Sequence, residues 1–163
     1  MSAPTQTTDI GTVPPQSEWQ AILRQTAVEV FSTMVGVTVT VPEESDLPVS
    51  AHVTGMIGIA GPLSAIFSIR CSEHSAIMLA SQMLGVSLAK AAEQKCDAVG
   101  EICNIVAGYF KAKIGLGDRC QLSVPTVVAG TDYQVHSSEK DTRLELPLLY
   151  GGEPLWLALD IRP

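Results

Sequence analysis

Several features that define large classes of proteins are missing from this sequence of 163 residues. No apolar run reaches the roughly 18–20 residues of a membrane-spanning helix, and the first residues lack the basic start and apolar segment of a signal peptide. The ten Lys and Arg residues are scattered and the net charge is −7, whereas nucleic-acid binding needs clustered positive charge. We therefore expect a cytoplasmic protein that binds neither membranes nor nucleic acids.

The cysteines and histidines lack the spacings of common sites. The four cysteines form no Cys-x-x-Cys pair, so reduced thiols are expected. The three histidines have neither His-x-His nor His-x-x-x-His spacing, so no metal site is expected. A Cys-x5-Arg phosphatase loop, a Gly-x-Ser-x-Gly elbow and a Walker glycine loop are also missing. The sequence therefore shows no activated nucleophile.

What is present is the composition of one globular domain. Hydrophobic residues make up 46% of the chain and charged residues 17%, which supports a substantial core in a length typical of one domain. Residues 1–16 are rich in Pro, Thr, Ser and Gln, which predicts a flexible tail. The folded domain is expected over residues 17–163.

Hydrophobic periods and turn residues predict helices and strands in one chain. Ser17 and Gln20 have the spacing of a capping box, and the helix they open is expected to end near Gly36. The other predicted elements are a strand at 37–42, two strands within 49–71 joined at Gly61-Pro62, a helix at 72–85 between Ser72 and Gly85, a helix at about 90–114, and strands at 121–130, 142–152 and 153–161 with a turn at Gly151-Gly152.

Two parts of the sequence resemble each other weakly. Residues 62–70 and 154–162 share Pro-Leu, five intervening residues and Ile-Arg, and each follows a long predicted helix. Aligning those helices places 29–36 on 101–108, so that a glutamate and a glycine coincide. Short apolar segments can look alike by chance, but the repeated order of helix and hairpin favours a duplication.

The predicted helix at 97–113, DAVGEICNIVAGYFKAK, carries an unusual polar line. With a helical advance of about 100° per residue, Asp97, Glu101, Asn104, Gly108 and Lys111 fall within an arc of roughly 80°. Apolar residues fill the other sides, and Cys103 is expected to point inward. Asparagine is a poor residue for the middle of a helix because its amide competes with the backbone.

Two interpretations of this line stay open. The ordinary one is the solvated face of a core helix, with Asp97 and Lys111 as surface charges. The other is a site in which Asn104 orients a water by hydrogen bonds and Glu101 binds a cation of a partner. Glycines at 100 and 108 would allow a helix or a docking protein to come close.

Three aromatic residues, Tyr109, Phe110 and Trp156, are expected in the core, and Trp19 in the core or at a dimer contact.

The motif Asp97-x3-Glu101-x2-Asn104, followed by Ile-Val-Ala-Gly, resembles the signature of the chemotaxis phosphatases of the CheC, CheX and FliY group. GMIGIAGPL at 55–63 and LSVPTVVAG at 122–130 extend the resemblance over nearly the whole expected domain. The resemblance implies an α+β fold of two layers, pseudo-duplicated, with long helices on a largely antiparallel sheet. It also implies hydrolysis of the phospho-aspartate of a CheY-like response regulator.

The resemblance implies roles for residues of the polar line. Asn104 would orient the attacking water, and Glu101 would pair with the lysine of the regulator's active site. Asp97 and Gly108 would have supporting roles. The Mg²⁺ that the reaction needs belongs to the regulator in this family, so no cofactor is expected on this chain.

Family members with two sites carry Glu-x-x-Asn on both long helices. The first helix of this chain has Glu29 and Ser32 instead, a degenerate second site, so we predict one working site per chain. This pattern resembles the CheX branch, whose members are dimers joined through their sheets, and implies a homodimer. The alternative function is a non-catalytic binding module that docks on a receiver domain or a flagellar-switch component.

Overall fold

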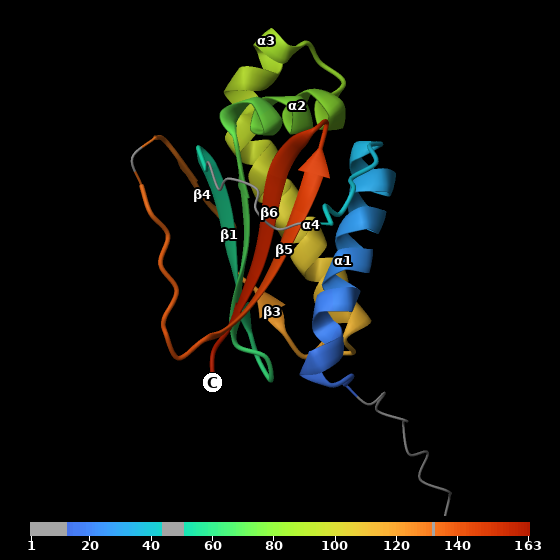
Figure 1. Ribbon diagram of the computed structural model, residues 1–163, viewed down its shortest axis with the longest axis vertical. Coiled ribbons are helices and arrows are strands. Elements are labelled where there is room, and N and C mark those ends of the chain that lie inside the picture. Colours follow the sequence, from blue (N-terminus) through green and yellow to red (C-terminus); the bar gives the residue numbers. More distant parts are fainter. Residues whose placement is uncertain (1–12, 44–50, 132) are drawn as a thin grey trace, which may run out of the picture.

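The computed structural model describes residues 13–43, 51–131 and 133–163, in which helices cover one face of an antiparallel sheet (Figure 1). The strand order is β3-β1-β2-β6-β5. Both β3 and β4 pair with the same edge of β1, β3 near its end and β4 near its start. The strands are β1 (Val53–Ala60), β2 (Ala65–Cys71), β3 (Gln121–Leu122), β4 (Thr126–Ala129), β5 (Thr142–Tyr150) and β6 (Glu153–Ile161). The expected α+β fold of two layers is confirmed.

Within the described residues, four helices accompany the sheet. They are α1 (Trp19–Val30), α2 (Glu73–Leu84), α3 (Leu88–Ala91) and α4 (Lys95–Lys113). Short turns extend them: a 3-10 turn at Gln16–Glu18, a π-helical turn at Phe31–Val35 and a 3-10 turn at Ala92–Gln94. The long helices α1 and α4 lie side by side on the sheet, while α2 and α3 lie across its upper end (Figure 1).

The core lies between these two layers. Alternate residues of the central strands point at the helices, as the period of two in a strand requires. On β2 these are Ala65, Phe67, Ile69 and Cys71, and on β6 they are Leu155, Leu157, Leu159 and Ile161, all buried. The rings of Trp19 on α1 and Phe110 on α4 pack in a T-shaped pair, with ring centroids 6.1 Å apart. Both aromatic residues are buried, so the core interpretation of Trp19 is the one observed.

The two similar hairpins meet at the centre of the sheet. β2 and β6 are antiparallel neighbours, and Phe67 pairs directly with Leu159. Each is the fifth residue after the proline that opens its copy. A local two-fold axis therefore passes between them and relates the two hairpins, with α1 and α4 on the same face. This register supports the internal duplication.

Several expected ends and turns are confirmed. Ser72 accepts a hydrogen bond from the backbone N–H of Ser75 and caps α2, and Gly85 ends that helix in the left-handed conformation. Gly36 ends the first helical segment in the same way. Gly151 and Gly152 both have positive φ at the turn between β5 and β6, as a two-residue hairpin turn requires.

Other local predictions were wrong. Ser17 caps no helix, because it lies within the 3-10 turn, and the side chain of Glu18 makes no cap hydrogen bond. Over 37–42 a single bridge joins Thr40 to Leu149, because the chain only touches the edge strand β5 there. The strand expected at 121–130 is two short strands, since the chain leaves the edge of β1 between them. By contrast, the helix expected at about 90–114 is present as a helical run from Leu88 to Lys113, in which the 3-10 turn Ala92–Gln94 separates α3 from α4.

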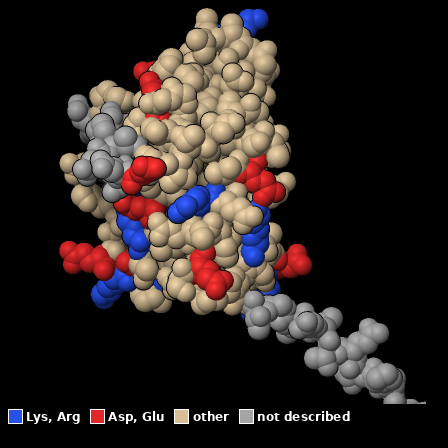
Figure 2. Space-filling view, turned by 45° about the vertical axis from the view of Figure 1, so that its right-hand side comes forward, with Lys and Arg blue, Asp and Glu red and all other residues tan. Residues whose placement is uncertain are grey.

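The expected tail falls mostly on residues 1–12, which lie outside the described residues. Its last part is described, and there the carbonyl of Pro14 accepts a hydrogen bond from the indole N–H of Trp19. In the described part of the chain no single helix is long and apolar enough to cross a membrane; Glu73–Leu84 and Leu88–Lys113 meet the length and composition only together, across a bend of 109°. Figure 2 shows Lys and Arg interspersed with Asp and Glu on one face, with few charged residues over its upper part.

Candidate functional site on helix α4

Helix α4 is held by its apolar sides. Its buried residues include Val99, Ile102, Cys103, Val106 and Phe110, and they pack into the main core. The approach to β1 is close, because a Cβ at Gly55 would lie 3.0 Å from Cγ1 of Val99. The main chain of α4 is therefore rigidly placed, and its remaining face is available for polar groups.

The polar line predicted on this helix is present. Asp97 and Glu101 are exposed, and Asn104 and Gly108 are half-buried at its edge. The side chains of α4 that form hydrogen bonds within the described chain are those of Lys95, Cys103, Lys111 and Lys113. Within that part of the chain the side chains of Asp97, Glu101 and Asn104 form none, so their polar atoms are free to meet a partner or water.

Lys111, the fifth member of the line, has a structural role. Its Nζ donates to the carbonyls of Gly117, at 2.6 Å, and Cys120, at 2.8 Å. It therefore fixes the loop that follows α4 and is not a free surface charge. The functional line is reduced to the carboxylates, the amide and the glycine.

The segment at residues 122–127, here called the strap, borders this line. A Cβ at Gly100 would lie 3.3 Å from Cγ2 of Val127 and 3.5 Å from Cβ of Pro125. A Cβ at Gly108 would lie 3.9 Å from Cδ1 of Leu122, in ordinary contact. The segment that packs closely on Gly100 is thus the strap of the same chain, whereas Gly108 is only half-buried and has room beside it.

Residues 53–149 match the family model of the chemotaxis phosphatase CheX, more than half of the chain. The chain belongs to the CheX family. A curated relative, the CheY-P phosphatase CheX of Thermotoga maritima, is 28% identical over 122 residues, which cover 66% of this chain and 79% of the relative. The matched range contains the whole polar line of α4 and the strap.

Solved structures share the fold of this CheX-family chain. The chemotaxis protein CheX of Vibrio vulnificus has a TM-score of 0.76 at 22% identity and covers 89% of this chain and 99% of its own. A chain in the crystal structure of the CheX–CheY–BeF3–Mg²⁺ complex of Borrelia burgdorferi has a TM-score of 0.69 at 18% identity, with coverages of 89% and 98%. The expected family and fold class are therefore confirmed.

The residues of the degenerate second site lie on the first helical segment. Glu29 is exposed on α1 and forms an ion pair with Lys113 of α4. Ser32 is exposed in the π-helical turn that follows. Glu29 therefore already has a cationic partner in its own chain, whereas Glu101 forms no ion pair within the described chain. The family match at 53–149 leaves Glu29 and Ser32 out.

Two residues that were predicted to lie in the core, Tyr109 and Trp156, do not lie there. Tyr109 is 46% exposed, because it lies on the outward side of α4 rather than against the sheet. Trp156 is half-buried on the sheet face away from the helices, where it pairs with Arg70 across the strands. Cys103 does point inward, and burial raises the pKa of its thiol to about 12.

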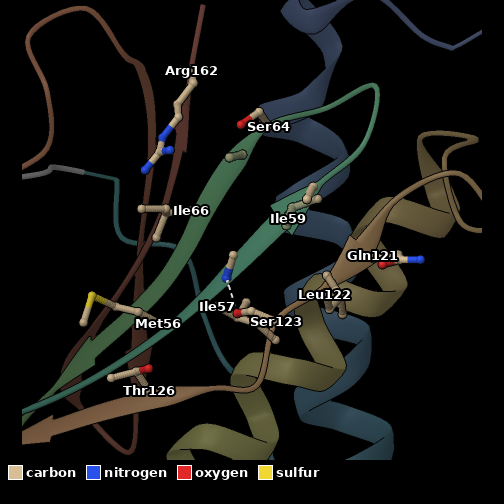
Figure 3. Close-up of a pocket in the computed structure, with 13 residues that line it drawn as sticks. Met56, Ile57, Ile59, Ser64, Ile66, Gln121, Leu122, Ser123, Thr126 and Arg162 are labelled. Atoms are coloured by element: carbon tan, nitrogen blue, oxygen red, sulfur yellow. Dashed lines mark hydrogen bonds between the residues drawn. The ribbon is translucent and has the colours of Figure 1, made fainter.

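Neither the position of the strap beside α4 nor the Glu29–Lys113 ion pair could be predicted from the sequence, since both join segments far apart in the chain. The strap also borders a hollow of about 560 Å³ on the sheet side, drawn in Figure 3. Its lining residues include no carboxylate and no histidine among those described, and Arg162 is the charged one. The described residues likewise contain no cluster of three His, Cys, Asp or Glu that could hold a metal ion.

Proposed function

We propose that this protein hydrolyses the phospho-aspartate of a CheY-like response regulator. The observation that supports this most directly is the pair Glu101 and Asn104, one helical turn apart on the outward side of α4 and without a side-chain partner among the described residues. Membership of the CheX family points to the same activity. So does the curated relative, whose name is CheY-P phosphatase.

In this proposal the receiver domain supplies the acyl phosphate, the Mg²⁺ and a lysine. The amide of Asn104 orients a water, and the carboxylate of Glu101 pairs with the lysine. The water oxygen bonds to phosphorus while the bond from phosphorus to the aspartate oxygen breaks, so inorganic phosphate leaves and the carboxylate is restored. Because the electrophile is already activated, positioning of the water is what the enzyme has to add.

The remaining residues of the line have supporting parts. Asp97 adds a second negative charge on the side of α4 where the lysine would approach, and Gly108 keeps the helix surface low beside Asn104. The homodimer, the cytoplasmic location and the supply of Mg²⁺ by the receiver stay predictions of the same proposal.

The first prediction concerns Asn104→Ala. We expect about a 100-fold loss of the acceleration of phospho-receiver decay, as for other single groups that position or stabilise reacting atoms. The free energy of unfolding should rise by about 0.5 kcal/mol, since alanine favours a helix interior more than asparagine does. The measurements are the decay of a phosphorylated CheY-like receiver and urea unfolding of both proteins.

The matched control is Ser32→Ala, which removes a polar group at the corresponding position of the first copy and should leave the decay rate unchanged. A wild-type protein that binds the phosphorylated receiver but leaves the lifetime of every cognate receiver unchanged would establish the non-catalytic binding module instead.

A further inference from the structure

The strap runs along α4 in the opposite direction to the helix. Leu122 lies beside Gly108, and Pro125 and Val127 lie beside Gly100. Asn104 is halfway between these two glycines along α4, and Ser123 and Val124 lie between Leu122 and Pro125 along the strap. From this antiparallel course we infer that Ser123 and Val124 come closest to the level of Asn104. The strap is therefore one wall of the surface that contains Glu101 and Asn104.

The strap is anchored on its sheet side. The backbone N–H of Ser123 donates to the carbonyl of Gly58 at 2.9 Å. The backbone N–H of Gly58 donates to Oγ of Ser123 at 2.8 Å, the dashed line in Figure 3. The residues from Thr126 onward pair with β1 as β4. Lys111 holds the carbonyl of Cys120 just before the strap begins. A segment fixed at so many points presents its side chains in a defined place.

Val124 is the residue that this strap presents. Its side chain is 85% exposed, more than any other large apolar residue exposed in the described chain. Oγ of Ser123, its neighbour, is held by the backbone N–H of Gly58 on β1, whereas the side chain of Val124 faces solvent. Pro125 restricts the backbone on the other side of the valine. The exposed ring of Tyr109 and half-buried Ile105 lie on the outward side of α4. Apolar groups thus flank the polar pair.

We propose that the strap is a docking wall for the receiver domain and that Val124 is its apolar anchor beside the phosphorylated site. The inference rests on the proposed function. The receiver is the occupant that fits, because Asp97 and Glu101 leave two exposed carboxylates without an ion pair among the described residues, which complement the lysine of a receiver active site. An apolar contact next to that charge pair would exclude water from it.

The experiment uses Val124→Asp, with Leu84→Asp as the matched control. Leu84 is likewise an exposed apolar residue, 53% exposed, but it is the last residue of α2 and no part of the strap. Binding to a receiver activated with beryllium fluoride and Mg²⁺ is measured by calorimetry, and phospho-receiver decay gives KM and kcat. Light scattering of each variant gives its oligomeric state.

We expect Val124→Asp to raise both Kd and KM by about tenfold, the effect of losing one buried valine, with kcat and oligomeric state unchanged and Leu84→Asp equal to wild type. Unchanged binding, an equal effect of Leu84→Asp, or dissociation of an oligomer by Val124→Asp would each overturn the docking wall. If the wild type binds the activated receiver without hastening decay, the proposed phosphatase function fails, and the Kd of Val124→Asp still decides whether the strap docks the receiver. A wild type that neither binds nor hastens decay overturns both proposals.

Discussion

Asn104 and Gly108 weaken the helix that carries them. In the interior of a helix glycine costs about 1 kcal/mol relative to alanine, and asparagine costs roughly half a kcal/mol. Neither residue is required by packing, since Gly108 has only ordinary contact with Leu122 and the amide of Asn104 has no partner in the described chain. Residues that cost stability without serving the core are expected where a surface has a function.

Gly108→Ala tests whether this glycine lowers the stability of the helix in favour of receiver binding. A Cβ fits there without a clash, so the free energy of unfolding should rise by about 0.5–1 kcal/mol. If the receiver docks closely because glycine has no side chain there, the added methyl group should raise KM for the phosphorylated receiver by several-fold while kcat changes little. Urea unfolding and the decay assay measure the two effects. Higher stability with unchanged KM would remove Gly108 from the docking surface.

At the scale of elements, the start of α2 is tied to the β5–β6 hairpin. Oε2 of Glu153 accepts hydrogen bonds from the hydroxyls of Ser72, at 2.7 Å, and Ser75, at 2.8 Å. These hydrogen bonds, Ser72 first, lower the pKa of the Glu153 carboxyl below its ordinary value. The negative charge also lies near the N-terminus of α2, where the helix dipole favours it.

This link predicts a pH-dependent effect of Glu153→Gln. A carboxyl whose pKa is lowered by folding stabilises the fold above its unfolded pKa, and this contribution is lost as the pH falls through the folded pKa. We expect the variant to lose about 1 kcal/mol of unfolding free energy at neutral pH and the difference from wild type to shrink in acid.

Urea unfolding of both proteins at neutral pH and below the ordinary pKa of glutamate measures this change. Glu139→Gln is the control, since Glu139 is exposed and makes no ion pair with the described residues. A difference between Glu153→Gln and wild type that is the same at both pH values would show that charge is not what ties the hairpin to α2.

At the scale of the whole molecule, a duplicated fold has kept two helices but unequal sites. On α4 the glutamate is unpaired within the described chain and the asparagine is present. On the first helical segment Glu29 pairs with Lys113, and Ser32 lies in a π-helical turn, where the spacing of side chains around the axis differs from that of an α-helix.

The prediction is that Ser32→Asn does not rescue Asn104→Ala. The double variant should retain about one hundredth of the wild-type acceleration, like Asn104→Ala alone, because the amide is misplaced and the glutamate is occupied. The phospho-receiver decay assay compares the double and single variants. Recovery to near the wild-type rate would mean that the serine is all that disables the second site.

Much of this architecture could be predicted from the sequence because it follows from local patterns. The polar line on α4, the caps at Ser72 and Gly85 and the Gly-Gly hairpin turn depend on neighbours within a few residues. Tyr109 was misplaced because hydrophobicity alone does not tell which side of a helix with a narrow polar line meets the core. The strap could not be foreseen, since its position depends on Gly58 and Gly100, which are distant in the chain.

The sequence predicts helices and strands in one chain and one complete Glu-x-x-Asn line, because residue spacing sets which side chains share a face. The family resemblance adds that these elements form an α+β domain. What surrounds that line depends on contacts between distant segments. The packed structure assigns Lys111 to the loop after α4, pairs Glu29 with Lys113 and places the strap beside Gly100 and Gly108. These facts depend on how separate segments pack against one another, and helical periodicity carries no information about that packing.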